Sequence, residues 1–446
     1  MTFAEGELRE LFDALKPAHA EYAAEFPGDT GARQPVHTVY GGAHLFRAAT
    51  ARTLGSLALR MLDEFGGNPN EFAATLGVPG SIAEKVFSRL RQKLEREPVE
   101  DFRIDFEDGY GNRPDAEEDQ HALQAAAEVA RGKAEGLLPP YIGIRIKPFT
   151  EGLQARSVRT LDLFLNALVE QCDRHLPEGF VITFPKIASA EQVTALVVLL
   201  ERFETAHWLK PGSLQIELMI ETPQSIFDSE GRVAIPKLMR AARGRCRGAH
   251  FGVYDYTAAC EIIAEYQGMA HPACDFARDV MQTSLAGRGV MMSDGATNVM
   301  PIAPHRGGSL SAEQRDENRR SVHRAWRLHF EQVQRSLQRG FYQGWDLHPA
   351  QLPTRYAAVY SFFLQSLDAA SARLKNFAGK AAQATLAGDV FDDAATGQGL
   401  LNFFLRGLSC GAITVDETLA TGLTHDDLRT RSFIKILEAR RTREAG

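Results

Sequence analysis

The stretch that decides the fold is LQIELMIETPQSIFD, residues 214–228. Its first half is rich in strand-forming residues and stops at Glu221, Thr222 and Pro223. Proline lacks the backbone N–H that a central sheet ladder needs, so the strand ends there and Glu221 lies at its C-terminal tip. In parallel α/β folds catalytic groups gather at these tips, where a carboxylate can hold a divalent cation. The alternative is a loop-facing acid that only starts the next helix.

Length and composition indicate a globular protein with no nucleic-acid or membrane surface. The 446 residues suit one large catalytic domain with an appendage. A hydrophobic share of 44% and a charged share of 24% are ordinary, and the net charge of -7 argues against a general nucleic-acid surface. No stretch reaches the ~18 apolar residues that a membrane span requires.

Cysteine usage and the start of the chain predict a cytoplasmic protein. The five cysteines contain no CxxC pair, and their odd number suits a reducing compartment better than a disulfide framework. The opening residues MTFAEGELRELFDALK have two acids before any base and no long apolar run, so we expect no secretory signal.

Strand candidates recur along the chain with helix-length segments between them. They are PVHTVY (35–40), FRIDFED (102–108), YIGIRIKPF (141–149), FVITFPKI (180–187), LQIELMIET (214–222), GAHFGVYDY (248–256), VMMSDGAT (290–297) and FYQGWDLHP (341–349). Repeated βα units indicate a parallel sheet, and eight of them suit a closed (β/α)8 TIM barrel. The competing architecture is a doubly wound open sheet, but the GxGxxG pattern typical of that fold is absent.

The segments outside this series are helical. Residues 1–30 resemble an acidic amphipathic helix that lies on the surface, and 45–98 form a long helical insertion between the first two strands. We therefore expect a barrel over 1–352, with this N-terminal helix and the insertion, and a helical C-terminal cap over 353–446 with no convincing strand.

Polar residues at the predicted strand tips should meet at one end of the barrel. Glu221 and Asp255, from adjacent strands, can bind Mg²⁺ or Mn²⁺ and leave positions open for water or substrate. Such a cation can bind the carboxylate and keto oxygens of a 2-oxo acid. Arg145 can neutralise the negative charge of the acid and donate hydrogen bonds to one of its oxygens. The other members are Glu107, Asp108, Lys186 and His348.

Each member also has a structural alternative. Arg145 could form an ion pair on the barrel floor with Glu217, and Lys186 could only orient a loop. His348, before a proline, could cap the barrel through a backbone hydrogen bond instead of binding substrate or a proton. Spacing does not decide whether Glu107 or Asp108 points inward.

Six short motifs, in this order, resemble the citrate lyase beta-subunit-like family, also called the HpcH/HpaI aldolase family. They are Glu107-Asp108 after an acidic strand, RIK (145–147), FPKI (184–187), MIETP (219–223), FGVYD (251–255) and HPAQ (348–351). The family includes malyl-CoA lyases and is related to malate synthases among the phosphoenolpyruvate/pyruvate-type barrels. The resemblance implies a Mg²⁺-dependent enzyme with Glu221 and Asp255 as metal ligands and Arg145 as the oxyanion-stabilising group.

A second resemblance lies in the C-terminal segment. FDDAAT (391–396), followed by a helix, is similar to the malate synthase segment whose aspartate enolises acetyl-CoA, and the correspondence falls on Asp393. An N-cap acid that opens the helix is the structural alternative. Related enzymes place such a segment over a neighbouring subunit, which implies a homo-oligomer. Gly109, Tyr110 and Gly111 follow Asp108 where the lyases have small apolar residues, which leaves the acyl pocket and the use of CoA open.

The sequence thus predicts a Mg²⁺-dependent carbon–carbon lyase or aldolase acting next to glyoxylate, pyruvate or oxaloacetate. Its ligands are a small 2-oxo or hydroxy acid and, as an open question, an acyl-CoA. Arg145, Asp393, Asp108 and Glu107 are the predicted catalytic residues, and Lys186 and His348 the predicted substrate-binding ones. One alternative is a malate synthase-like acyltransferase that condenses acyl-CoA with glyoxylate. Another is a non-catalytic barrel that binds an organic acid or acyl-CoA.

Overall fold

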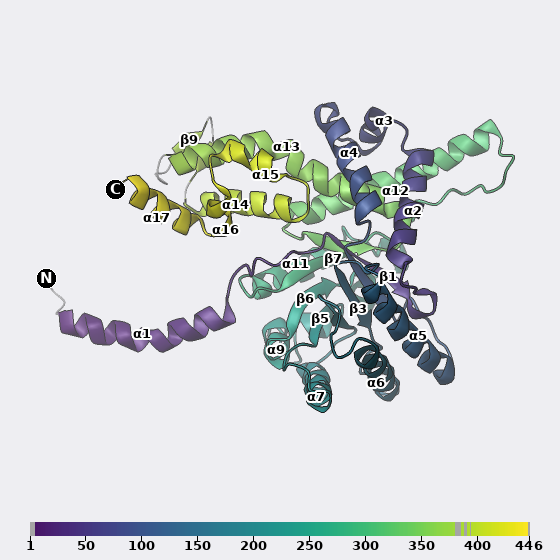
Figure 1. The fold of residues 1–446 in the computed structure, drawn as a ribbon, viewed down its shortest axis with the longest axis horizontal. Helices are drawn as coiled ribbons and strands as arrows, with labels where there is room; N and C mark the ends of the chain where they lie inside the picture. The colour runs from purple at the N-terminus through teal and green to yellow at the C-terminus, as the bar shows by residue number, and fades with distance from the viewer. Residues whose placement is uncertain (1–4, 380–384, 388–389, 393, 445–446) are drawn as a thin grey trace.

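The computed structural model describes residues 5–379, 385–387, 390–392 and 394–444, and its centre is a closed barrel of eight parallel strands (Figure 1). The strands are β1 (His37–Gly42), β2 (Asp101–Asp105), β3 (Tyr141–Arg145), β4 (Val181–Phe184), β5 (Gln215–Ile220), β6 (Cys246–Phe251), β7 (Met291–Ala296) and β8 (Gln343–Asp346). Pairing of β8 with β1 closes the barrel. The predicted (β/α)8 fold is therefore confirmed.

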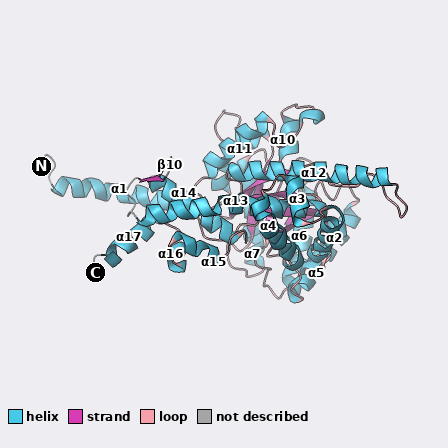
Figure 2. Cartoon of the chain, turned by 90° about the horizontal axis from the view of Figure 1, so that it is seen from above, coloured by secondary structure: helices cyan, strands magenta, loops and turns pink. Residues whose placement is uncertain are grey.

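Helices surround the barrel on its outside (Figure 2). Those that follow β2 to β8 are α5 (Asp115–Ala134), α6 (Gln154–Gln171), α7 (Ala190–Ala206), α8 (Pro223–Ile226), α9 (Ile235–Ala241), α10 (Val253–Ala259), α11 (Pro272–Leu285), α12 (Ala312–Gln338) and α13 (Leu352–Gly379). The predicted insertion between β1 and β2 consists of α2 (Thr50–Phe65), α3 (Pro69–Leu76) and α4 (Gly80–Arg96). Short 3-10 turns occupy Ala43–Leu45, Ala264–Tyr266, Pro349–Gln351 and Leu419–Thr421.

Charged side chains point into the barrel. Side chains alternate between the two faces of a strand, so the charged residues at every second position share the inward face. In β2 the apolar Phe102 and Ile104 alternate with Asp101, Arg103 and Asp105, and all five are buried. Burying these ions is costly unless they are paired. The guanidinium of Arg103 contacts Asp101 and donates to the carboxylate of Glu217 at 2.6 Å. Glu217 thus pairs with Arg103, and the alternative pairing of Glu217 with Arg145 is wrong.

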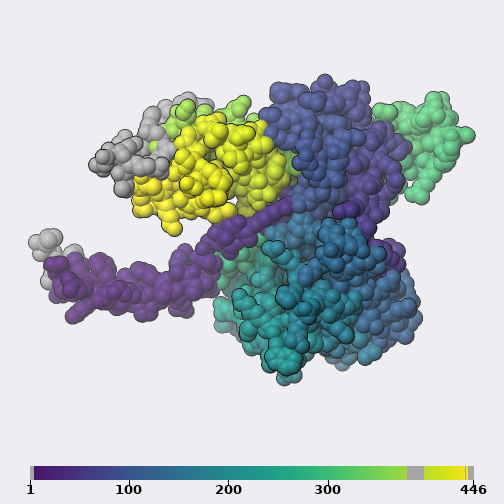
Figure 3. Space-filling model, viewed as in Figure 1, coloured from purple at the N-terminus to yellow at the C-terminus, as the bar shows by residue number. Residues whose placement is uncertain are grey.

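A C-terminal layer lies beside the insertion (Figure 3), and its contact with Gln34 places it toward the N-terminal ends of the strands. It contains β9 (Thr385–Ala387), β10 (Val390–Asp392), α14 (Ala394–Ser409), α15 (Val415–Thr418), α16 (His425–Arg429) and α17 (Phe433–Glu444). In α14, Arg406 donates to the side chain of Gln34, just before β1, at 2.7 Å. The antiparallel pair β9–β10 differs from the expectation of a region without strands.

The helix α13 connects the barrel to this layer. Near its start Tyr356 donates to the backbone oxygen of Pro98 at 3.0 Å, and farther along α13 packs against α14. One helix therefore belongs both to the barrel and to the C-terminal layer, so a domain boundary at residue 352 remains a proposal.

The N-terminal helix α1 (Glu5–Glu25) runs away from the barrel in both ribbon views (Figures 1 and 2). None of its residues is buried. The sequence predicted the helix, but it does not lie on the surface as expected. In the described part of the chain, no helix combines the length and the apolar character needed to cross a membrane.

The predicted strands extend past the observed strand ends. Strand β6 ends at Phe251, and Asp255 lies in the first turn of α10, so its assignment to a strand is wrong. Gly252 forms the junction, where an added Cβ would lie 2.3 Å from an oxygen of Glu221. The chain therefore turns away from the sheet tightly against Glu221, which brings the next helix close to that acid.

The pairing of Arg103 yields a stability prediction. Arg103→Met removes the cation between Asp101 and Glu217, and we expect the free energy of unfolding to fall by about 3 to 5 kcal/mol in urea denaturation. The matched control is Arg320→Met, which breaks the exposed pair with Asp316 and should cost less than about 1 kcal/mol. Equal small losses in both variants would contradict the role of Arg103.

Candidate functional site

Six of the predicted residues meet at the C-terminal ends of the strands, and we call them the mouth cluster. They are Glu107, Asp108, Arg145, Lys186, Glu221 and Asp255. The solvent exposure of the side chains differs across the cluster. The Glu221 residue is 1% exposed, whereas the side chains of Asp255 and Asp108 are 38% and 58% exposed. Solvent therefore reaches one side of the cluster only.

Arg145, the last residue of β3, is held by Asp105, the last residue of β2. Its Nε donates to one carboxylate oxygen at 2.7 Å and its Nη2 to the other at 2.5 Å, and the two residues are register partners. This fork fixes the guanidinium plane. The third nitrogen, Nη1, lies 3.2 Å from Glu107 and 3.7 Å from Asp108. Arg145 thus directs the Nη1 edge of its guanidinium toward the mouth.

Lys186 contacts both the Glu107–Asp108 pair and the Glu221–Asp255 pair of the mouth cluster. Its Nζ contacts Glu107 and lies 3.1 Å from Asp108 and 3.5 Å from Asp255. Its backbone N–H donates to Glu221 at 2.7 Å. The φ of Lys186 is 48°, in the left-handed region that a side chain other than glycine rarely adopts. Backbone strain of this kind concentrates at functional sites, and here it directs the N–H at an acid.

Burial and repulsion set the protonation of the acids. Burial, followed by the charge of Asp255, raises the pKa of Glu221 to about 8. Burial also raises the pKa of Glu107 to about 7, against the attraction of Arg145. The pKa of Asp108 is lowered, because the hydrogen bond with Glu107 and the nearby cations outweigh its burial. A proton shared by this pair therefore resides on Glu107.

The acids around Lys186 and Arg145 in turn stabilise the positive charge of these two side chains. Burial alone would lower the pKa of Lys186, but Glu107, Asp255 and Asp108 raise it above its ordinary value. Burial works against the charge of Arg145 as well, yet Asp105 holds its pKa well above the usual range. Both side chains stay positive at neutral pH.

The donor set suits a divalent cation. Two carboxylates, Glu221 and Asp255, lie close enough for one to disfavour the charge of the other. A hard dication relieves such repulsion, and Mg²⁺ is commonly held by one or two carboxylates together with water and substrate. Among the described residues no three His, Cys, Asp or Glu side chains gather as ligands. The remaining positions would then belong to water and substrate.

Other polar residues at the predicted tips lie outside the mouth cluster. His348 caps a short turn, where its Nδ1 accepts from the backbone N–H of Ala350 at 3.2 Å, and burial lowers its pKa. Its role in substrate binding stays a prediction. Asp346 is fully buried and bonds to His37, His329 and Arg355.

The predicted catalytic residue Asp393 lies outside the described residues. The segment after it, α14, belongs to the C-terminal layer, whose Arg406 contacts Gln34 at the opposite end of the strands. Its role therefore also stays a prediction.

Two neighbours of Arg145 were missed by the sequence reasoning. The alternation of side chains along a strand could have identified Asp105. It lies two residues from both Arg103 and Glu107 and therefore shares their inward face, whereas Phe106 faces outward. Tyr40, near the end of β1, packs under Arg145 with 4.8 Å between the guanidinium carbon and the ring centroid. Its signal was weak, since a tyrosine near a strand end is common in any barrel.

The raised pKa of Glu107 predicts a pH-dependent stability. An unfolded glutamate titrates near 4.5, so the folded state keeps a proton that the unfolded chain releases. The contribution of Glu107 to wild-type stability therefore falls as pH rises from about 4.5 to about 7. Glu107→Gln cannot ionise, and relative to wild type its free energy of unfolding should gain on the order of 2 kcal/mol between about pH 5 and about pH 8.

The control for this experiment is Glu178→Gln, which changes an exposed acid. Chemical denaturation at each pH measures both variants. A difference between Glu107→Gln and wild type that stays constant with pH would contradict the assignment of the proton.

Comparison with solved structures finds the same fold at low sequence identity. A citrate lyase from Burkholderia xenovorans LB400 is similar with a TM-score of 0.56 and 16% identity, over 87% of this chain and 97% of that one. A Haloferax volcanii malate synthase in a magnesium and glyoxylate complex gives a TM-score of 0.44 and 14% identity, over 91% and 97% of the two chains. At 16% identity the likeness to the citrate lyase concerns the fold alone.

The comparison with curated proteins finds no match. A protein-family model, described as Domain of unknown function (DUF6986), matches residues 15–436. This match spans the barrel, the insertion and most of the C-terminal layer. The chain therefore belongs to the DUF6986 family.

Proposed function

We propose that this barrel is a Mg²⁺-dependent carbon–carbon lyase or aldolase that acts next to a 2-oxo acid. The observation that carries the proposal is the mouth cluster, where two mutually repelling acids and a rigidly held guanidinium share one opening. The resemblance to the citrate lyase beta-subunit-like family rests on the same residues. Fold similarity to a citrate lyase is consistent with this chemistry.

Glu221 and Asp255 would hold the Mg²⁺, with Mn²⁺ as an alternative. When bound, the ion supplies positive charge for the carboxylate and keto oxygens of the 2-oxo acid. The raised pKa of Glu221 implies competition between proton and metal, so metal affinity should increase with pH.

Arg145 would bind the carbonyl oxygen that becomes negative when the carbon–carbon bond breaks or forms. Asp105 fixes two of its nitrogens, and the edge that carries Nη1 faces the mouth acids, so little reorganisation is needed as charge develops. Lys186 would hold Glu107 and Asp108 in place and offset their charge when an anionic substrate enters.

The proton at the enol carbon needs a carboxyl group that titrates near the working pH. Among the described residues Glu107 fits best, because its pKa is raised to about 7, and the adjacent Asp108 can share the proton. Asp393 remains the other candidate. The resemblance to related enzymes, which place such a segment over a neighbouring subunit, implies that Asp393 would serve the mouth of that subunit.

Metal binding is tested by thermal unfolding of the chelator-treated protein with and without Mg²⁺. A ligand that binds only the folded state raises the Tm, by a few °C at saturating Mg²⁺. We expect this rise in wild type and its loss in Asp255→Asn. The control Asp426→Asn changes an exposed acid and should keep the rise. Equal rises in all three proteins would place the metal elsewhere.

Activity is tested by screening retro-aldol cleavage of malyl, citramalyl and hydroxy-oxo acids with and without Mg²⁺. For the substrate that is cleaved, Arg145→Lys should lower kcat by about 10² to 10³, because an ammonium cannot keep the fork to Asp105 and the contact with the oxyanion together. The pH profile of Glu107→Gln should lose its limb near pH 7. No turnover of any substrate in the presence of Mg²⁺ would contradict the lyase proposal.

Two alternatives make different predictions in the same assays. A malate synthase-like acyltransferase, suggested by residues 391–396, would release free thiol and form malate from acetyl-CoA and glyoxylate. A non-catalytic barrel would bind an organic acid or acyl-CoA without turnover. Glu221→Ala should abolish turnover by either enzyme, whereas an unchanged Tm with Mg²⁺ and no 2-oxo acid binding would favour the silent barrel.

A further inference from the structure

Tyr40 lies against the guanidinium of Arg145 inside the barrel. It belongs to β1, where side chains alternate between the two faces, so it shares the inward face of Thr38, whose hydroxyl donates to Asp101 at 2.9 Å. The guanidinium carbon of Arg145 lies over the Tyr40 ring, 4.8 Å from its centroid. This is within the ~6 Å over which a cation is attracted to the face of an aromatic ring. Tyr40 therefore covers one face of the guanidinium.

The ring restricts the one motion that the carboxylate of Asp105 leaves to Arg145. Asp105 accepts from Nε at 2.7 Å and from Nη2 at 2.5 Å, which holds one edge of the planar guanidinium. A guanidinium held by one edge can still tilt about that edge, whereas a ring packed against its face resists the tilt. With one edge and one face occupied, Nη1 stays directed at Glu107, 3.2 Å away.

The Tyr40 ring is itself held by its neighbours in the barrel. Trp345 packs against it with 4.8 Å between the ring centroids. The indole Nε1 of Trp345 donates to Nδ1 of the buried His250 at 3.1 Å, and Nε2 of His250 lies 3.2 Å from Glu217. Because the indole can only donate, Nδ1 accepts and Nε2 carries the proton that His250 donates to Glu217. The support of Tyr40 is therefore fixed by directional hydrogen bonds.

The hydroxyl of Tyr40 contributes little to this arrangement. Its oxygen lies 3.5 Å from Nδ1 of His250 and 3.9 Å from the sulfur of Met219, both long for a hydrogen bond. Burial raises the pKa of Tyr40 above its ordinary value, so the hydroxyl stays protonated at neutral pH. The part of Tyr40 that acts on Arg145 is therefore the aromatic ring.

We propose that Tyr40 is a positioning residue for Arg145 and that Trp345 and His250 support it. The ring keeps the guanidinium from tilting, so Nη1 is already aimed when a negative oxygen develops at the mouth. Donors that are fixed in advance need little reorganisation during the reaction. The effect on turnover rests on the proposed lyase function, whereas the effect on the guanidinium itself does not.

The first test needs no turnover and consists of crystal structures of wild type, Tyr40→Phe and Tyr40→Leu. Phenylalanine keeps the ring, so Arg145 should keep both contacts with Asp105. Leucine removes the ring, and we expect Arg145 to lose at least one of these contacts or to occupy more than one orientation. If Tyr40→Leu does not fold, Tyr40→Met fills the same space with a flexible chain and makes the same comparison. An Arg145 that keeps its wild-type position without the ring would overturn the proposal.

The second test is kinetic and uses the substrate that the cleavage screen identifies. Tyr40→Leu should lower kcat about 10- to 30-fold and keep KM within about 3-fold, because the lost alignment matters only in the transition state. Tyr40→Phe should keep kcat within about 3-fold of wild type. The Mg²⁺-dependent rise in Tm should remain in both variants, since Glu221 and Asp255 are unchanged.

The possible results separate the two proposals. A loss of kcat in Tyr40→Phe as large as in Tyr40→Leu would mean that the hydroxyl transfers a proton, and equal kcat in wild type and Tyr40→Leu would mean that the ring is dispensable. Either result would overturn the positioning role. If wild type cleaves no substrate, the lyase proposal fails, and the position of Arg145 in the crystal structures alone decides the role of Tyr40.

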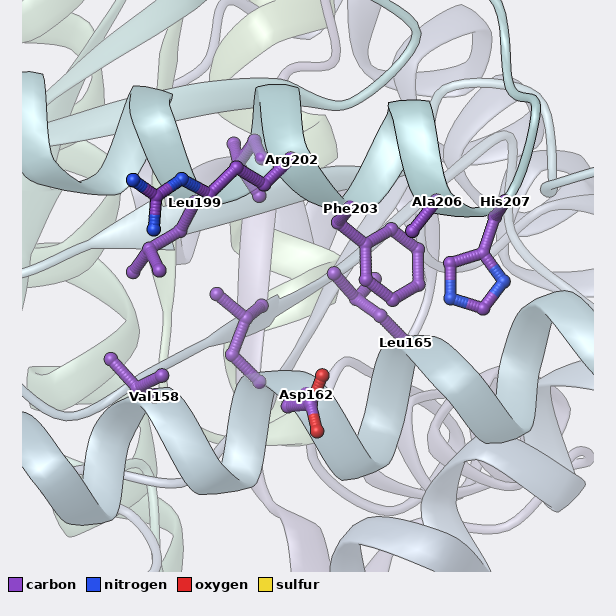
Figure 4. A pocket seen from close by; sticks show the side chains of 10 residues that line it. Val158, Asp162, Leu165, Leu199, Arg202, Phe203, Ala206 and His207 are labelled. Carbon is purple, nitrogen blue, oxygen red and sulfur yellow. The ribbon is translucent and has the colours of Figure 1, made fainter.

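Two aromatic residues elsewhere provide matched controls. Tyr141, at the start of β3, packs against Arg247 with 4.1 Å between the guanidinium carbon and the ring centroid. Phe203 stacks on His207 with ring centroids 4.2 Å apart, in the hollow between α6 and α7 on the outside of the barrel (Figure 4). Tyr141→Leu and Phe203→Leu should leave Arg145 in place and keep kcat within about 3-fold of wild type. Losses in these controls equal to that of Tyr40→Leu would show a general loosening of the barrel and overturn the proposal.

Discussion

A buried charge in this barrel is stable only beside an opposite charge, and this constraint organises the molecule from the floor of the barrel to its mouth. Arg103 lies between Asp101 and Glu217 at the floor, and Arg145 is forked by Asp105 above them. Leaving any of these ions alone in a low dielectric would cost several kcal/mol. On β2 the apolar residues therefore face outward, and the inward face carries paired ions.

At the mouth the same constraint is only partly met. Arg145 and Lys186 face more acids than they can neutralise, because Glu107, Asp108, Glu221 and Asp255 all converge there. Burial, reinforced by repulsion from neighbouring acids, raises the pKa values of the two glutamates of the mouth cluster. A site with uncompensated negative charge, a fixed guanidinium and access to solvent is suited to a dication and an oxygen-rich anion.

The sequence revealed the fold because its signals were local. Residues 214–223 combine a strand-forming run with a proline stop, and seven further runs repeat at βα spacing. Strand ends were less predictable, since they depend on close packing such as that of Gly252 against Glu221. Asp255 was therefore placed in a strand although it opens a helix. Asp105 is the last residue of β2 and precedes the polar tip, so only strand parity with Arg103 and Glu107 indicates that it faces inward. The direction of α1 could not follow from a helical pattern, which fixes no tertiary contact.

Side chains of alternating charge lie along one side of the barrel, from its floor to its mouth. Asp101, Arg103, Asp105, Arg145, Glu107 and Lys186 follow one another in this order, over roughly 20 Å of strand and loop. The pairs within this column are Arg103 with Asp101, Arg145 with Asp105, and Lys186 with Glu107. A change to one member therefore strands its partner as an unpaired ion, so substitutions along this side of the barrel are tolerated best when both members of a pair change together.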